Sequence, residues 1–140
     1  MKEPLLVFRE IEKSFSGSQI LSGVDLSLYP GKCILLSGKN GVGKTTLLKI
    51  IAGLEIPDLA KIEISGKTNC WKKAVRSVRK EIIYLHQNPI MFSSTVESNV
   101  AYGLRFTSLN RKQRRESVEE ALEWAGLMDV AKKQANTLSG

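Results

Sequence analysis

The glycine-rich stretch Gly38 to Thr46, "GKNGVGKTT", is the feature that most constrains what this chain of 140 residues folds into. It fits the pattern G-x-x-x-x-G-K-[ST], with Lys44 and Thr45 in the last two places. A short unbroken apolar run, Cys33 to Ser37, precedes it, and apolar residues with helical spacing follow it. A strand, a glycine loop and a helix in direct succession predict a phosphate-binding loop. A plain strand-to-helix turn is the alternative.

The residue types of this loop suit a nucleoside triphosphate. Glycines let successive backbone N–H groups turn inward around an anion, and the following helix adds the positive end of its dipole. We expect Lys44 to reach the β- and γ-phosphates and the Thr45 hydroxyl to ligate Mg²⁺. The predicted nucleotide-binding residues here are Gly38, Lys39, Asn40, Gly41, Val42, Gly43, Lys44, Thr45 and Thr46.

The first two thirds of the chain read as α/β. Leu5 to Ile11 and Val24 to Tyr29 predict strands of a partly exposed, antiparallel sheet, and "KIEIS" before Gly66 predicts another strand. Cys33 to Ser37 and Ile82 to Leu85 are continuous apolar runs, which predict strands buried on both faces.

The last third reads as helical, with helices expected at Val96 to Leu104 and Asn110 to Ala125. Asn110 and Gln113 stand at the positions of a capping box, and Gly126 ends the second helix. Its expected apolar stripe is Val118, Ala121, Leu122 and Ala125. We therefore divide the chain into residues 1–88, a partial nucleotide-binding core, and 89–140, a helical subdomain.

Composition narrows the class of protein further. The net charge of +7 favours acidic partners, but its Lys and Arg clusters have few aromatic residues between them, so we interpret them as solvated helix faces and expect no nucleic acid. The two cysteines and single histidine have no metal-ligand spacing. The N-terminus predicts neither a signal peptide nor a membrane span. We expect a cytoplasmic protein.

Nearly the whole chain resembles the ATP-binding cassette family, the nucleotide-binding subunits of membrane transporters. The stretch from Leu6 to Asp58 is similar to the family's lead-in strands, P-loop and first helix. "EIIYLHQNPIMFSSTVESNVAYGL" is similar to its glutamine loop and following helix, and residues 110–137 to its helical subdomain. The resemblance implies a P-loop NTPase fold of the α/β class with N-terminal antiparallel β-strands and a helical subdomain, and ATP and Mg²⁺ as cofactors.

The resemblance also assigns residues outside the P-loop. Phe15 takes the position of an aromatic residue that stacks on adenine, with a core role as the alternative. Gln87 takes the position of a catalytic glutamine whose amide approaches Mg²⁺ and the attacking water. His86 is not the family's switch histidine, and we treat it as structural. Met91 and Phe92 either are buried or line the groove that receives a membrane subunit.

The final residues Leu138, Ser139 and Gly140 resemble the first half of the LSGGQ signature. In the family this serine and the amides after it contact ATP bound by a second subunit, in a head-to-tail dimer. The aspartate, catalytic glutamate and switch histidine that follow in the family are not in this sequence. We therefore expect a fragment with weakened nucleotide binding, negligible steady-state hydrolysis, exposed apolar edges and a tendency to aggregate.

One further departure concerns Ala60, which stands where the family usually has a turn glycine, so a positive-φ turn there would be strained or rebuilt. The implied partners are transmembrane permease subunits, a second ATP-binding subunit and, indirectly, a substrate-binding protein, on the inner face of the cell membrane. The segments "YLHQNPIMF" and "SNVAYGL" look most like importers of oxyanions such as tungstate, molybdate or phosphate.

Three other functions stay open. A non-hydrolysing ATP-binding module or a pseudogene product would fit an intact chain of this length. A non-transport ATPase of the same family, acting on nucleic acid or the ribosome, would fit the net charge of +7. A small P-loop kinase would have no reason to carry Gln87 and the final Leu-Ser-Gly.

Overall fold

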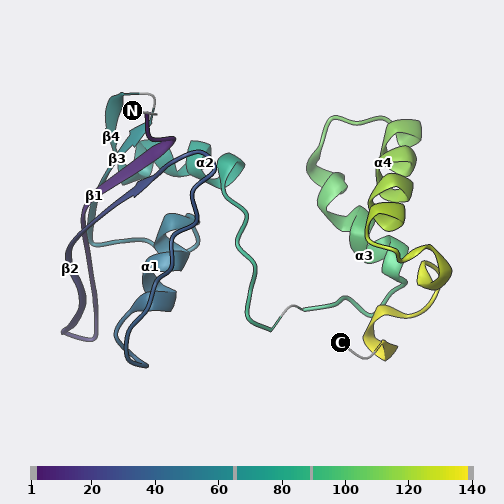
Figure 1. The fold of residues 1–140 in the computed structure, drawn as a ribbon, viewed down its shortest axis with the longest axis horizontal. Helices are drawn as coiled ribbons and strands as arrows, with labels where there is room; N and C mark the ends of the chain where they lie inside the picture. The colour runs from purple at the N-terminus through teal and green to yellow at the C-terminus, as the bar shows by residue number, and fades with distance from the viewer. Residues whose placement is uncertain (1–2, 65, 89, 139–140) are drawn as a thin grey trace. The chain divides into compact units, whose positions relative to one another are not determined.

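A computed structural model describes residues 3–64, 66–88 and 90–138. The chain forms two compact units, Met1–Leu85 and His86–Gly140. The first unit is an antiparallel sheet with two helices, and the second is helical (Figure 1). None of the described helices has the length and apolar character to cross a bilayer.

The sheet of the first unit has the strand order β2-β1-β3-β4, with every neighbouring pair antiparallel. Its strands are β1 (Leu6–Phe15), β2 (Ser18–Leu28), β3 (Leu59–Ile64) and β4 (Lys67–Cys70). The three strands predicted at the N-terminus and before Gly66 are confirmed, although β1 and β2 are longer than predicted because they continue into one hairpin.

Two helices pack on this sheet, α1 (Lys44–Ile51) and α2 (Trp71–Glu81). Phe8, Ile11 and Ile62 of the sheet meet Ile50 of α1 and Val78 of α2 in the core, and all five are fully buried. Burial of one such side chain contributes about 1.5–3 kcal/mol. This core holds the helix that follows the glycine loop against the hairpin.

Helix α2 and strand β4 are elements of the first unit that were not predicted from the sequence. Trp71, Ala74 and Val78 are buried at helical spacing, and that spacing is the signal that predicts the helix. Its cations Lys72, Lys73, Arg76, Arg79 and Lys80 are all exposed. The cluster therefore lies on the exposed part of a helix, and its interpretation as a solvated face without a nucleic-acid partner stays a prediction.

The two predicted buried strands are wrong in the part of the chain described here. Residues 33–37 and 82–85 run without strand pairing, and Leu35 and Ile83 are 88% and 97% exposed. An apolar run becomes a buried strand only when other strands pair with it and both its faces are covered. Among the described residues neither segment has such partners, so Leu35, Ile83 and Leu85 face outward, although Ile82 packs against the core.

Ala60 also departs from expectation. It lies inside β3 and is buried, and it is not among the described residues with a positive φ outside glycine, which are Glu10 and Ser16. The turn is therefore rebuilt as strand. Pairing of Leu59 with Glu12 begins the β1–β3 ladder at this point, so alanine carries no strain here.

The second unit contains α3 (Val96–Tyr102), the 3₁₀ helix η1 (Gly103–Phe106) and α4 (Arg111–Trp124). Two further 3₁₀ turns follow, η2 (Met128–Val130) and η3 (Ala135–Thr137). Val118 and Leu122 of the predicted α4 stripe are buried against Val96, Ala131 and Ala135. Ala121 and Ala125 are exposed instead, because only Val118 and Leu122, one helical turn apart on α4, face this small core.

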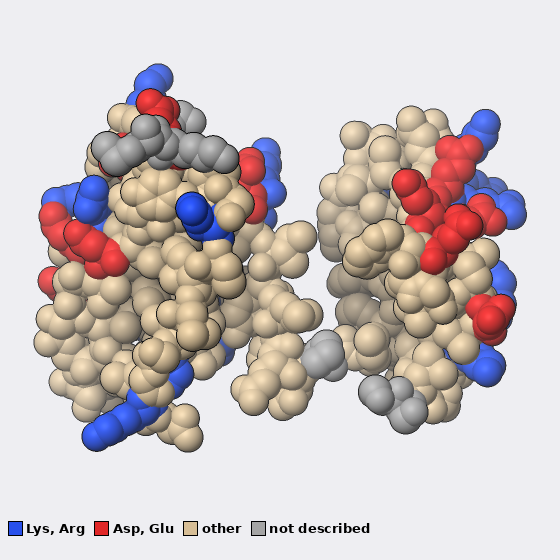
Figure 2. All heavy atoms as spheres, in the orientation of Figure 1, with Lys and Arg blue, Asp and Glu red and all other residues tan. Residues whose placement is uncertain are grey.

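Charges on α4 are segregated along its axis. The exposed cations Arg111, Lys112 and Arg115 lie at its N-terminal end, and Glu116, Glu119, Glu120 and Glu123 follow. The acidic group covers one side of the helix in Figure 2. This order is unfavourable, because the N-terminal end of the helix dipole is positive and repels the cations. The capping hydrogen bonds at the N-terminus have to offset this repulsion.

The capping box at this N-terminus is confirmed. The Gln113 N–H donates to Asn110 Oδ1 at 3.0 Å, and the Asn110 N–H donates to Gln113 Oε1 at 2.9 Å. We expect Asn110→Ala to lower the free energy of unfolding of this unit by about 1 kcal/mol. Urea denaturation of the chain followed by helical circular dichroism checks this. Glu120→Ala, an exposed change in the same helix, serves as control and should shift it by less than about 0.5 kcal/mol.

A second local feature, the bulge of β1 at Glu10, depends on Asp25. Glu10 has a φ of 53°, and its N–H donates to Asp25 Oδ1 at 2.8 Å while Arg9 Nη1 donates to Oδ2 at 3.3 Å. The hydrogen bond from the Glu10 N–H, aided by Arg9 and opposed by desolvation, lowers the pKa of Asp25 from its ordinary 3.8.

A lowered folded pKa means that this carboxylate stabilises the fold above its ordinary value and loses that effect as pH falls through the folded value. We expect the melting temperature of Asp25→Ala to lie below that of the unchanged chain at neutral pH. The difference between the two melting temperatures should disappear below pH 3.8. Thermal melts across that range check it, with Asp129→Ala as control. A melting-temperature difference that stays constant with pH would contradict a contribution of the ionised Asp25 carboxylate to stability.

Candidate phosphate site and flanking residues

The P-loop backbone adopts conformations that require glycine. Gly38, Gly41 and Gly43 have φ values of 145°, 81° and 99°. Gly43 is also the N-cap of α1. A Cβ added at Gly43 would lie 2.8 Å from Ile20 Cγ2 and 3.1 Å from the Ile20 carbonyl oxygen. Glycine is therefore needed here both for its backbone freedom and for the close approach to β2.

Lys44 folds back over the loop that precedes it. Its Nζ donates to the carbonyl oxygens of Gly38 and Lys39, at 2.7 Å in each case. A lysine ammonium has three donors, so these two bonds fix its position and leave a donor for an anion. The side chain is half-buried and cannot sweep freely through solvent.

The start of α1 adds donors to the same place. The first helical bond runs from the Leu47 N–H to the Gly43 carbonyl at 2.9 Å. In a helix that begins this way, the N–H groups of Lys44, Thr45 and Thr46 point out of the helix end. Thr45 is exposed in this first turn, and its hydroxyl is the hard oxygen ligand that Mg²⁺ prefers. These residues fit a phosphate chain with its metal ion.

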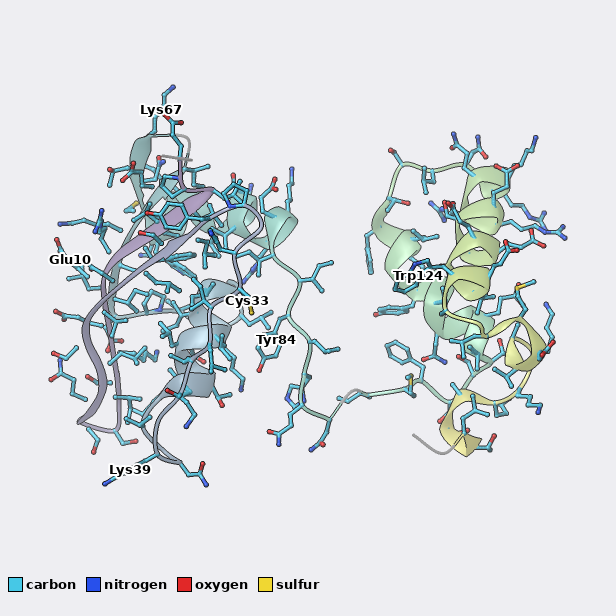
Figure 3. All side chains as sticks on the ribbon, viewed as in Figure 1. Glu10, Cys33, Lys39, Lys67, Tyr84 and Trp124 are labelled. Atoms are coloured by element: carbon cyan, nitrogen blue, oxygen red, sulfur yellow. The ribbon has the colours of Figure 1, made fainter. Side chains whose placement is uncertain are left out.

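Phe15 is the last residue of β1 and is 45% exposed, so it is not a core residue. The tip of the β1–β2 hairpin and the P-loop, marked by Lys39, lie at the same end of the first unit (Figure 1, Figure 3). The contact of Gly43 with Ile20 agrees with this arrangement. Phe15 ends β1 at this tip, so its exposed side chain lies at the same end of the unit as the P-loop.

The remaining predicted site residues lie in the second unit. Gln87 is exposed in a bend at the start of that unit. Ser139 and Gly140 fall outside the described residues. The first unit thus places Gly38 to Thr46 and Phe15 at one end, while the binding roles of all the predicted site residues stay predictions.

An exposed aromatic ridge in the second unit consists of Phe92, Tyr102 and Phe106. Ring centroids of Phe92 and Tyr102 lie 4.4 Å apart, and those of Tyr102 and Phe106 lie 6.1 Å apart. Met91 and Phe92 are 55% and 46% exposed, which rules out the alternative that both are buried. We did not predict from the sequence that Tyr102 and Phe106 belong to an exposed surface. The signal for it was their spacing of four residues, which places two side chains on the same face of a helix.

Asn99 of α3 holds the segment that carries Phe92. Its Oδ1 accepts the Phe92 N–H at 2.8 Å, and its Nδ2 donates to the carbonyls of Phe92 at 3.1 Å and Thr95 at 3.0 Å. The irregular segment before α3 is thereby tied to the helix. The ridge is consequently a fixed surface rather than a loose loop.

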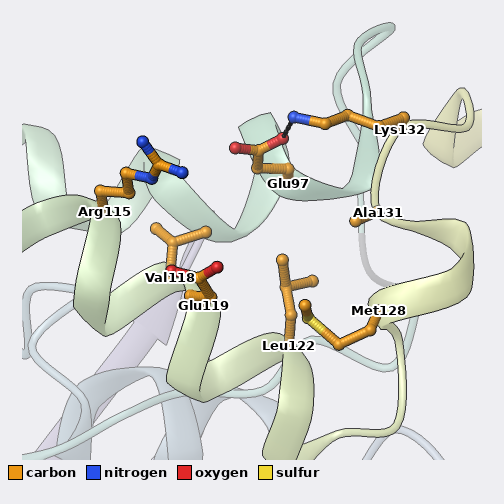
Figure 4. Close-up of a pocket in the computed structure, with 8 residues that line it drawn as sticks. All are labelled: Glu97, Arg115, Val118, Glu119, Leu122, Met128, Ala131 and Lys132. Carbon is orange, nitrogen blue, oxygen red and sulfur yellow. Dashed lines mark hydrogen bonds and ion pairs between the residues drawn. The ribbon is translucent and has the colours of Figure 1, made fainter.

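A cavity of about 260 Å³ lies between α4 and η2 of the second unit (Figure 4). Val118, Leu122 and Met128 form its apolar floor. Charged groups surround it, including the ion pair between Lys132 and Glu97. None of the predicted site residues that the structure describes lines it.

Comparison with known proteins identifies the family to which this chain is similar. The family model described as ABC transporter matches residues 21–140. The spermidine/putrescine import ATP-binding protein PotA of Marinobacter nauticus is 35% identical over 141 residues, which cover 100% of this chain and 37% of that protein. The phosphate import ATP-binding protein PstB 2 of Natronomonas pharaonis is 36% identical, over 93% of this chain and 50% of its own length.

Among solved structures, CbiO1 of Clostridium perfringens, part of the ABC transporter complex CbiONQ, is similar in fold. It shares 27% identity with a TM-score of 0.80, over 99% of this chain and 57% of that one. The chain spans between about a third and three fifths of the length of these three relatives. The matched family model, the relatives and the P-loop geometry agree that this chain belongs to the ABC transporter family of ATP-binding proteins.

Proposed function

We propose that this chain is the nucleotide-binding part of an ATP-binding subunit that powers an ABC importer. The observation that carries the proposal is the P-loop, in which Lys44 is held by two loop carbonyls at 2.7 Å beside the open N-terminus of α1. This arrangement presents a cation and a row of N–H donors to one anion.

Each residue has a distinct part in nucleotide binding. The loop amides and Lys44 bind and orient the phosphates, and Thr45 supplies the metal ligand from the chain. Bound Mg²⁺ would offset the phosphate charge in phosphoryl transfer. Phe15 stacks on the base, and Gln87 orients water. Little or no turnover by these 140 residues on their own remains a prediction.

The partners follow from the family. We infer permease subunits at the inner face of the cell membrane, a second copy of the ATP-binding subunit and, indirectly, a substrate-binding protein. Relatives named for polyamine, phosphate and methionine import do not single out one cargo. The oxyanion cargo therefore rests on the two segments quoted above alone.

Nucleotide binding is tested by Lys44→Ala. We expect the affinity for Mg·ATP to fall about tenfold or more, which corresponds to about 1.4 kcal/mol, because the phosphates lose a fixed cation. Isothermal titration at constant ionic strength measures it. Lys67→Ala is the matched control, since Lys67 is an exposed cation of β4 outside the P-loop. Equal affinity in both variants would contradict the assigned site.

Docking to the membrane subunits is tested by Phe92→Glu. The ridge of Phe92, Tyr102 and Phe106 is exposed apolar surface, and a charge within it would have to be desolvated on assembly. We expect recovery of the protein with host membranes to fall at least about fivefold. Trp124→Glu, at an aromatic residue of α4 that is 90% exposed, should leave it unchanged. Full recovery of Phe92→Glu would exclude this docking surface.

A further inference from the structure

Lys13 is a buried cation in the first unit that the predicted mechanism does not use. Its side chain is 11% exposed, and Nζ lies 2.9 Å from Glu55 Oε1 and 3.9 Å from Asp58 Oδ1. Nζ also donates to the Ile56 carbonyl at 2.7 Å. A buried charge is costly unless it is paired. Here the ion-pair and hydrogen-bond partners of the Lys13 ammonium all come from one loop.

That loop, Glu55 to Asp58, follows α1 and is tied to β1 by backbone groups as well. Asp58 Oδ2 accepts the Ser14 N–H at 2.6 Å, and the Asp58 N–H donates to the Glu12 carbonyl at 2.9 Å. The end of β1 is therefore fastened to the segment that leaves the P-loop helix. Lys13 is the side chain at the centre of this attachment.

The Lys13 ammonium also lies over the ring of Phe15. Nζ is 4.8 Å from the ring centroid, within the range of a cation–π contact. Lys13 covers one face of the ring, yet Phe15 is 45% exposed. Phe15 thus keeps exposed surface for contact with a flat ligand.

The same strands connect this ring to the phosphate loop. Lys13 pairs with Leu21 across the hairpin. The position of a Gly43 Cβ lies 3.1 Å from Leu21 Cδ2 and 2.8 Å from Ile20 Cγ2. A side chain that fixes Phe15 on β1 therefore fixes it relative to the P-loop on the other side of β2.

We propose that Lys13 is a positioning residue that holds the Phe15 ring in place for the nucleobase, with Glu55 and the Ile56 carbonyl anchoring its ammonium. The inference rests on the proposed nucleotide site. It adds a residue whose effect is confined to the base and does not extend to the phosphates. The ligand that it favours is a nucleoside triphosphate over a triphosphate without a base.

The test compares Mg·ATP with Mg·tripolyphosphate, which lacks the base, by isothermal titration of the full chain. We expect Lys13→Met to weaken ATP binding about three- to tenfold and to change tripolyphosphate binding less than about twofold. Lys13→Arg keeps a cation over the ring and should restore most of the affinity for ATP. Lys61→Met, which removes the Lys61–Glu10 ion pair of the same sheet, is the matched control and should change neither.

A structural role for Lys13 gives a different pattern, so a second variant separates the two. In a Phe15→Ala background there is no ring to position, and adding Lys13→Met should cause no further loss of ATP affinity. A further loss there, or equal weakening of both ligands by Lys13→Met, overturns the proposal. So does unchanged ATP affinity in Lys13→Met. Failure of the unchanged chain to bind either ligand overturns the nucleotide site itself and this inference with it.

Discussion

The packing of α1 against the antiparallel sheet is the interaction on which the rest of the first unit depends. Ile50 is fully buried against a core that contains Phe8 and Ile62 from two strands of the sheet. Without that contact the glycine loop would end in a helix with nothing to orient it, because an isolated helix of eight residues is not stable in water. The phosphate site is thus a consequence of a hydrophobic contact one turn away from it.

The same contact explains why Phe15 and the P-loop lie at one end of the first unit. The hairpin β1–β2 passes so close to the helix start that Gly43 has no room for a side chain. The hairpin tip carries Phe15, and the loop after α1 returns to hold Lys13. Two ends of one helix are therefore joined to one hairpin, so a movement of the hairpin tip would move the P-loop with it.

Apolar surface is left open where the first unit lacks strand partners. Ile34 and Leu36 border an apolar groove of about 260 Å³ that also includes Leu26, Leu28, Leu47 and Ile51. Leu35 and Ile83 point outward from segments without ladder partners among the described residues. A continuous apolar run indicates that a segment favours burial as a strand. Such a strand is buried only when neighbouring strands pair with it, and the run does not supply those strands.

The sequence by itself determined the local features whose causes lie within a few residues. These include the glycine pattern of the P-loop, the capping box of Asn110 and Gln113 and the stop at Gly126. It also placed Phe15 and Gln87 by resemblance. Only the tertiary structure decided that Ala60 lies in a strand, that residues 33–37 and 82–85 stay unpaired, and that Lys13 covers Phe15. The physical reason is range: caps and turns form between neighbours, whereas strand pairing and the contacts of Lys13 with the loop at Glu55 join residues about 40 positions apart and exist only once the core has formed.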